Sequence, residues 1–262
     1  ACNTAVGFNS LVQSTTSSNN TAVGRASLFS NTTGTQNVAI GALALDANTT
    51  ANDNTAVGYC SLSTNTTGCR NVAMGCGSLK TNLTGDRNTA VGHIALEANT
   101  SADNNTAVGY AALNVNSTGT QNVAVGANAL GANTASNNTA VGYHSLLQNT
   151  TGNSNTAVGQ CSLETNVSGV SNVAVGLQAL RQNTASDNVA IGTQALLVNQ
   201  TGTKNVAVGK SSLAGNTTAD NNTAIGWESL KANTTGQKNT AIGMESAIKT
   251  TTGQSNASVG HI

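Results

Sequence analysis

The stretch Asn54-Thr55-Ala56-Val57-Gly58, followed by Ser61-Leu62 and by Asn65-Thr66-Thr67-Gly68, carries most of the information about the fold. Its first five residues recur as Asn-(Thr/Val)-Ala-(Val/Ile)-Gly in sixteen copies, with departures at Met74 and, in the last copy, at Ala257 and Ser258. Of the fifteen intervals between the glycines, thirteen are 17 residues long and two are 16. A fixed period this short predicts an all-β solenoid, in which each repeat forms one coil with a short strand and stacks on the next.

Each position of the repeat has its own residue preference. The fourth residue before the glycine is Asn in all sixteen copies, and the fourth residue after it is Leu in fourteen of fifteen. The residue directly after the glycine varies freely, as Arg25, Tyr59, His93 and Trp227 show. We interpret the constrained positions as lying inside the coil or against a neighbour, and the variable ones as facing solvent.

The five-residue unit alternates in the manner of a strand. The Thr/Val and Val/Ile positions share one face, while Asn, Ala and Gly share the other. Because Thr and Val are nearly isosteric and exchange freely, as in Thr55, Val72 and Thr89, we expect this position to be packed, with one Val and one Leu buried in each coil. The near-invariant Ala either packs inside a thin coil or lets another chain approach closely. The thin core favours the second interpretation, with lateral association into a trimer.

The two 16-residue intervals each lose one residue at the same corner of the repeat, at residues 133–138 and 183–188. This predicts a surface turn there, with glycine or asparagine at positions of positive φ. The repeat is already present at Asn3 and still present at Gly260. We therefore expect a single continuous array over residues 1–262 with uncapped ends, as a segment of a longer chain or a subunit of a filament.

The composition excludes several function classes. Only 8% of the residues are charged and the net charge is zero, which argues against nucleic acid and anionic lipid as partners. No apolar run is long enough for membrane insertion. We find no catalytic or nucleotide-binding motif, and His93, His144 and His261 lie far apart in the sequence. The sequence therefore predicts no enzyme activity, no cofactor and no metal site.

Two kinds of covalent modification are candidates. The corner asparagine opens an N-x-S/T sequon at eleven positions, which would carry a column of N-glycans in a secreted eukaryotic or viral protein, or would simply be good turn chemistry. These residues are Asn31, Asn48, Asn65, Asn82, Asn99, Asn116, Asn149, Asn166, Asn199, Asn216 and Asn233. Among the five cysteines, Cys60 and Cys76 fall on adjacent coils at nearly matching positions and form the candidate disulfide pair.

The repeated unit, followed by Ser/Ala-Leu, resembles the head repeats of trimeric autotransporter adhesins and related phage and viral tail-fibre repeats. The resemblance covers the whole chain. It implies a left-handed β-roll with two short strands per coil, a side-by-side trimer, and binding to host surfaces. The chain departs from that pattern in its longer period and in its added Asn-Thr-Thr-Gly corner.

These observations predict a non-enzymatic extracellular protein that forms a fibre, filament or stalk, at a cell surface or as a virion appendage. Its main partner would be itself, end to end or as a lateral trimer. One alternative is a surface adhesin that binds glycans, a host surface or matrix ligands. Another is an ice-binding protein, although a Thr position that accepts Val in six coils is expected to be internal.

Overall fold

A computed structural model describes residues 2–261. The chain divides into two compact units, Ala1–Thr134 and Ala135–Ile262. The boundary lies within the first shortened corner of the repeat. Each unit is an all-β solenoid, which confirms the predicted fold class, and the described residues contain strands and turns but no helix.

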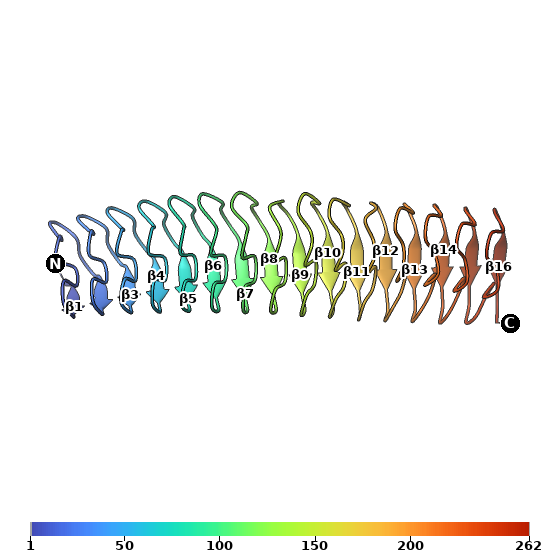
Figure 1. The fold of residues 1–262 in the computed structure, drawn as a ribbon, viewed down its shortest axis with the longest axis horizontal. Helices are drawn as coiled ribbons and strands as arrows, with labels where there is room; N and C mark the ends of the chain where they lie inside the picture. Colours follow the sequence, from blue (N-terminus) through green and yellow to red (C-terminus); the bar gives the residue numbers. More distant parts are fainter. Residues whose placement is uncertain (1, 262) are drawn as a thin grey trace. The chain divides into compact units, whose positions relative to one another are not determined.

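One strand of three residues occurs in each coil (Figure 1). The strands of the first unit are β1 (Thr4–Val6), β2 (Thr21–Val23), β3 (Val38–Ile40), β4 (Thr55–Val57), β5 (Val72–Met74), β6 (Thr89–Val91), β7 (Thr106–Val108) and β8 (Val123–Val125). Those of the second unit are β9 (Thr139–Val141), β10 (Thr156–Val158), β11 (Val173–Val175), β12 (Val189–Ile191), β13 (Val206–Val208), β14 (Thr223–Ile225), β15 (Thr240–Ile242) and β16 (Ala257–Val259).

Successive strands within a unit pair in parallel, with equivalent residues opposite each other. In the β4–β5 pair, for example, Ala56 lies opposite Ala73. The hydrogen bonding between coils continues beyond the strand, since the backbone N–H of Leu62 donates to the carbonyl oxygen of Ser78 at 3.0 Å. The Ser/Ala-Leu segment is nevertheless a turn, and Leu62 has a φ of 51°. The described coils therefore have one strand each, whereas the resemblance implied two.

The strand faces are oriented opposite to the packing we expected. The strand alanines from Ala22 to Ala241 are completely buried, while the Thr/Val and Val/Ile side chains on either side of them are partly or fully exposed. The expectation that each coil buries a Val was therefore wrong. Of the two interpretations of the near-invariant Ala, packing inside a thin coil is correct, so this residue no longer supports a trimer.

The interior of the coil has little free space. A Cβ atom added to Gly34 at the corner would lie 2.3 Å from the Asn31 Oδ1 atom and 2.4 Å from the carbonyl oxygen of Ala51. The buried leucine of each coil takes most of the remaining apolar space. The strand alanine is completely buried as well, and Val and Ile occupy the outer face of the strand.

Two columns of asparagine run through the interior of each unit. In the corner column, the Asn48 Nδ2 atom donates to Asn31 Oδ1 at 2.9 Å, and Asn65 Nδ2 donates to Asn48 Oδ1 at 3.2 Å. In the strand column, the Oδ1 atom of Asn37 accepts a hydrogen bond from the backbone N–H of Asn54 at 3.0 Å. Most of these amide groups therefore satisfy one another inside the coil, as buried polar groups usually do. The exceptions among the described asparagines are the Oδ1 atoms of Asn99, Asn116, Asn166 and Asn233.

The corner column also decides between the two interpretations of the sequons. All eleven sequon asparagines are completely buried. The Asn82 Nδ2 atom, for example, donates to Asn65 Oδ1 at 2.8 Å and to the Gly85 carbonyl oxygen at 3.0 Å. A glycan attached to Nδ2 is incompatible with this packing. The predicted glycan column at Asn31 to Asn233 is therefore corrected, and the asparagines serve the turn.

Removing one amide from the corner column should destabilise the second unit. In an Asn216→Ala variant, Asn199 Oδ1 would be left unpaired, because it accepts its hydrogen bond from Asn216 Nδ2 at 2.9 Å. Asn233 Nδ2 would also lose its bond to Asn216 Oδ1, at 3.0 Å, but would keep the one to the Gly236 carbonyl oxygen. Each buried partner left unpaired costs about 1–3 kcal/mol. We expect denaturant unfolding followed by circular dichroism to show a loss of that order.

The matched control is Asn153→Ala, because Asn153 is exposed at a corner of the same unit. An exposed substitution of this kind should change the free energy of unfolding by no more than about 0.5 kcal/mol. Equal stability of the two variants would contradict a structural role for the buried column.

Candidate functional site

The outward sheet face is the most regular surface of each unit. We define it as the Thr/Val and Val/Ile side chains of the strands, excluding the buried alanines. In the second unit Ile191, Ile225 and Ile242 are 42%, 39% and 40% exposed, and in the first unit Ile40 and Met74 are 41% and 42% exposed. No charged residue occurs at these positions. The result is two parallel columns of uncharged, largely aliphatic side chains that are not covered by other residues of the same unit.

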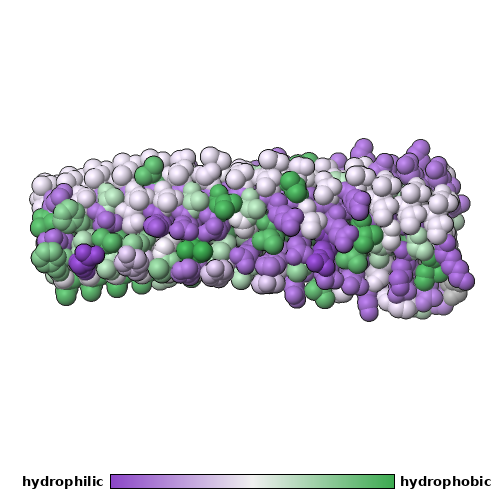
Figure 2. Space-filling model, viewed as in Figure 1, coloured by the Kyte–Doolittle hydropathy of each residue, from purple (hydrophilic) through white to green (hydrophobic). Residues whose placement is uncertain are grey.

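The rest of the surface is less regular. Figure 2 shows a face on which pale residues of intermediate hydropathy predominate, with hydrophobic and hydrophilic residues scattered among them. The exposed aromatic residues Tyr59, Tyr110 and Tyr143 occupy the variable position after the glycine. The His93 and Tyr110 rings of adjacent coils stack with centroids 5.7 Å apart. This is one local aromatic contact, and the aromatic side chains form no continuous band.

One polar cluster in the second unit brings together side chains that are far apart in sequence. We call it the Glu164 cluster and define it as His144, Cys161, Glu164 and Arg181. His144 and Cys161 occupy the same position on adjacent coils, two residues after Gly142 and Gly159. Glu164 and Arg181 likewise share the position five residues after the glycine of their coils. Stacking at a 17-residue period therefore brings together functional groups from three successive coils.

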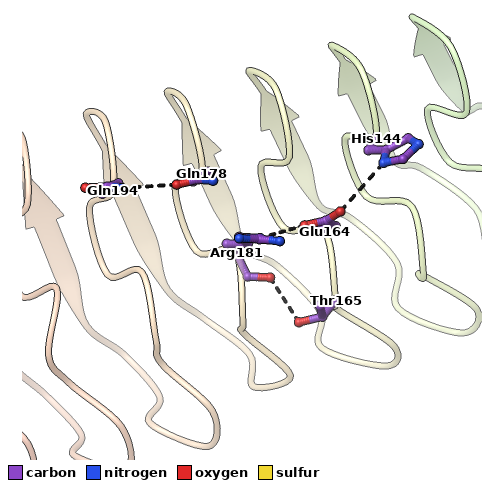
Figure 3. A network of polar contacts seen from close by, with 6 residues as sticks. All are labelled: His144, Glu164, Thr165, Gln178, Arg181 and Gln194. Carbon is purple, nitrogen blue, oxygen red and sulfur yellow. Dashed lines mark hydrogen bonds and ion pairs between the residues drawn. The ribbon is translucent and has the colours of Figure 1, made fainter.

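Glu164 is the centre of this cluster (Figure 3). Its Oε2 atom accepts a hydrogen bond from Arg181 Nε at 2.7 Å, and its Oε1 atom lies 3.7 Å from His144 Nδ1. The Glu164 side chain is only 13% exposed, whereas that of Arg181 is 41% exposed. The hydrogen bond to Glu164 raises the pKa of Arg181 above its usual value. Glu164 is thus held by Arg181 on one oxygen and faces His144 with the other.

Neighbouring residues position the cluster. The ring of Tyr143 stacks on the His144 imidazole, with centroids 3.8 Å apart and the planes inclined by 17°. The Thr165 hydroxyl donates to the carbonyl oxygen of Arg181 at 2.9 Å. Two coils further along, Gln194 Nε2 donates to Gln178 Oε1 at 3.1 Å in the same repeat position as His144 and Cys161 (Figure 3). The cluster is part of a polar column along this unit.

The cysteines are free thiols. Cys60 and Cys76 form no disulfide, so the predicted pair is corrected: Cys60 lies two positions and Cys76 one position after the glycine of its coil, so they do not share a position. Cys161 is partly buried beside Glu164. Burial, and then the negative charge of Glu164, raise the pKa of the Cys161 thiol. The sequence suggested no partner for Cys161, and the structure places its thiol beside the Glu164 carboxylate.

Other kinds of site are not found. The described part of the chain contains no pocket. Within residues 2–261 there is also no helical segment with the length and apolar character of a membrane span. No protein-family model matches the sequence, and comparison with curated proteins finds no similar one. Within the described residues, the outward sheet face and the Glu164 cluster are therefore the two candidate sites.

Asp46 provides a test of these electrostatics because it occupies the same repeat position as Glu164 but lacks an arginine. Its Oδ1 atom is buried without a hydrogen-bond partner, and desolvation raises the pKa of its carboxyl above 3.8. A raised pKa in the folded state means that this carboxyl stabilises the fold at low pH and ceases to do so as the pH rises through its folded-state pKa. We expect Asp46→Asn to raise the melting temperature at pH 7 and to have less effect at pH 3.

The same substitution at Asp53, which is exposed and lies later in the same coil, is the control and should leave the melting temperature nearly unchanged. Thermal unfolding at several pH values measures both variants. A pH-independent effect of Asp46→Asn would contradict the assignment to carboxyl desolvation.

Proposed function

We propose that this chain is a structural repeat protein without catalytic activity, which associates with copies of itself through the outward sheet face to build an extracellular fibre or stalk. The support for this proposal is the β-solenoid repeat together with the two uncharged columns of that face. A cell surface or a virion appendage is the proposed location, because a repeat array that self-associates suits an extended support.

The outward sheet face is suited to a second copy for two reasons. Contiguous apolar surface on one side of a protein marks an interaction site, and burying it contributes about 25 cal/mol per Å². In addition, every copy has the same spacing between coils, about 4.8 Å for paired strands. Once one pair of side chains interdigitates between two copies, equivalent pairs along the same unit meet in the same way. A surface without this periodicity offers no such match.

The absence of charged side chains from these two columns also favours association. A charged side chain would be desolvated at every coil on association, at a cost of several kcal/mol for each unpaired ion. The variable position after the glycine, by contrast, includes Arg25, Lys210 and other polar residues. The chain therefore confines charge to other positions and leaves the sheet face able to pack.

Charge introduced into the face should prevent association. We expect Ile191→Lys combined with Ile225→Lys to weaken self-association at least about tenfold, since each lysine would have to be desolvated in the interface. Sedimentation velocity over a range of concentrations, with negative-stain electron microscopy, measures the oligomer and its shape.

The matched control adds the same charge at two exposed positions directly after the glycine, Gln160→Lys and Met244→Lys. This control should associate like the unmodified protein. A monomeric unmodified protein at every concentration, or equal loss of association in both variants, would overturn the proposal.

A second candidate function is ice binding, and one observation favours it. The Thr/Val position of the strand faces outward, as in Thr156 and Thr223, so the threonine columns meet solvent. A regular, rigid array of threonine methyl and hydroxyl groups is able to order water. We expect an ice-binding protein to show thermal hysteresis at micromolar concentration, and Thr156→Lys to reduce it where Gln160→Lys does not. No hysteresis in the unmodified protein would remove this candidate.

A further inference from the structure

We propose that His144, Cys161 and Glu164 bind one divalent transition-metal ion of the zinc class. The proposal is independent of the outward sheet face and concerns a site on a different part of the second unit. It rests on the position of three ligand types that recur in zinc proteins: an imidazole nitrogen, a thiol sulfur and a carboxylate oxygen.

The three groups are already close. One ligand atom from each residue lies within 4.8 Å of the other two. In a tetrahedral zinc site, with bonds of about 2.0–2.3 Å, neighbouring ligand atoms are about 3.4 Å apart. The 3.7 Å between His144 Nδ1 and Glu164 Oε1 is nearly that distance. Small side-chain rotations about fixed backbone positions would bring Cys161 to the same separation, and water would supply a fourth ligand.

The surroundings orient two of the ligands. Stacking on Tyr143 restricts the plane of the His144 ring. The bond from Arg181 occupies Glu164 Oε2 and leaves Oε1 available to the ion. Groups that hold the ligands of a metal in place in this way contribute to affinity. The positive charge of Arg181 opposes the ion, but its side chain is 41% exposed and is therefore screened by solvent.

Binding has a defined proton balance. The Cys161 thiol gives up its proton to solvent, the resulting thiolate and the neutral imidazole each donate an electron pair to the ion, and Glu164 adds one carboxylate oxygen. No electron is transferred and no other reactant is required. Because a proton is released, affinity should rise with pH until the thiol is ionised in the free protein.

The identity of the ion follows from the donor set. Thiolate and imidazole together favour zinc over magnesium and calcium, which prefer oxygen ligands. Co²⁺ takes the same tetrahedral geometry and reports on it, because thiolate coordination produces a charge-transfer band in the near ultraviolet. It is therefore the probe of choice, followed by displacement with Zn²⁺.

The experiment is a Co²⁺ titration of the full chain, kept reduced with a phosphine. We expect one ion per chain with a thiolate charge-transfer band, bleached by one equivalent of Zn²⁺. Calorimetry of Zn²⁺ binding in buffers of different ionisation enthalpy should show release of about one proton at neutral pH. Cys161→Ser should abolish the band, and His144→Gln should weaken binding at least about tenfold.

The matched control is Cys60→Ser. Cys60 occupies the same repeat position as Cys161, but its equivalents on the adjacent coils are Leu43 and Gly77, which are not metal ligands. This variant should bind like the unmodified protein. Circular dichroism without metal checks that each variant is folded, and if Cys161→Ser is not, His144→Gln is decisive because the His144 side chain is 24% exposed and lies outside the packed interior. Unchanged affinity in folded His144→Gln, or loss of the band in Cys60→Ser, would overturn the proposal.

Discussion

Hydrogen bonds between asparagine side chains inside the coil are the interaction on which the rest of this structure depends. In the first unit they run without a break from Asn31 to Asn99 in the corner column. An amide both donates and accepts, so one side chain links the coil before it to the coil after it at the spacing of paired strands. Because each coil also has to hold two amides, the interior keeps room for one leucine and for side chains no larger than Ala or Ser. The width of the coil, and the residues allowed inside it, follow from this one requirement.

The same requirement explains why the larger aliphatic residues of the strand are on the outside. A protein normally buries Val and Ile, and exposed groups of them usually mark an interface. Here asparagine amides, backbone hydrogen bonds between coils and one leucine in each coil fill the interior. The apolar side chains of the strand therefore remain on the outward sheet face, where water solvates them poorly. The structural basis of the proposed self-association is thus the polar core itself. A conventional apolar core would have taken these residues inside and left a polar surface.

Much of this architecture was predictable from the sequence, and the part that was not has a physical explanation. The period, the short strand, the corner that tolerates deletion and the solenoid follow from strict repetition. Which face of the strand points into the coil does not follow from the repetition. Alternation with a period of two assigns residues to two faces without saying which face is inside. The uniform Ala was the usable signal, since only an interior with no spare volume requires the same small residue in almost every copy. The Glu164 cluster escaped recognition for another reason: metal motifs are usually sought among near neighbours in sequence, whereas a solenoid places residue i beside residue i+17. His144 and Cys161 are 17 residues apart.

The two asparagine columns also explain where the repeat tolerates a change of length. At the second 16-residue coil the corner column is interrupted, and the Oδ1 atom of Asn166 is buried without a hydrogen-bond partner. The column resumes at Asn183, whose Oδ1 accepts from Asn199 Nδ2 at 2.7 Å. The strand column is continuous through the same coil, since the backbone N–H of Asn188 donates to Asn172 Oδ1 at 3.0 Å. The corner column is also interrupted at Asn99, whose Oδ1 atom lacks a partner although the interval to the next coil has the full 17 residues. The stack therefore tolerates a missing side-chain hydrogen bond at the corner, whereas a deletion in a strand would shift its register and turn its Ala outward. The strand column preserves the continuity of the stack, and the corner is the only part of the coil that has been free to lose a residue.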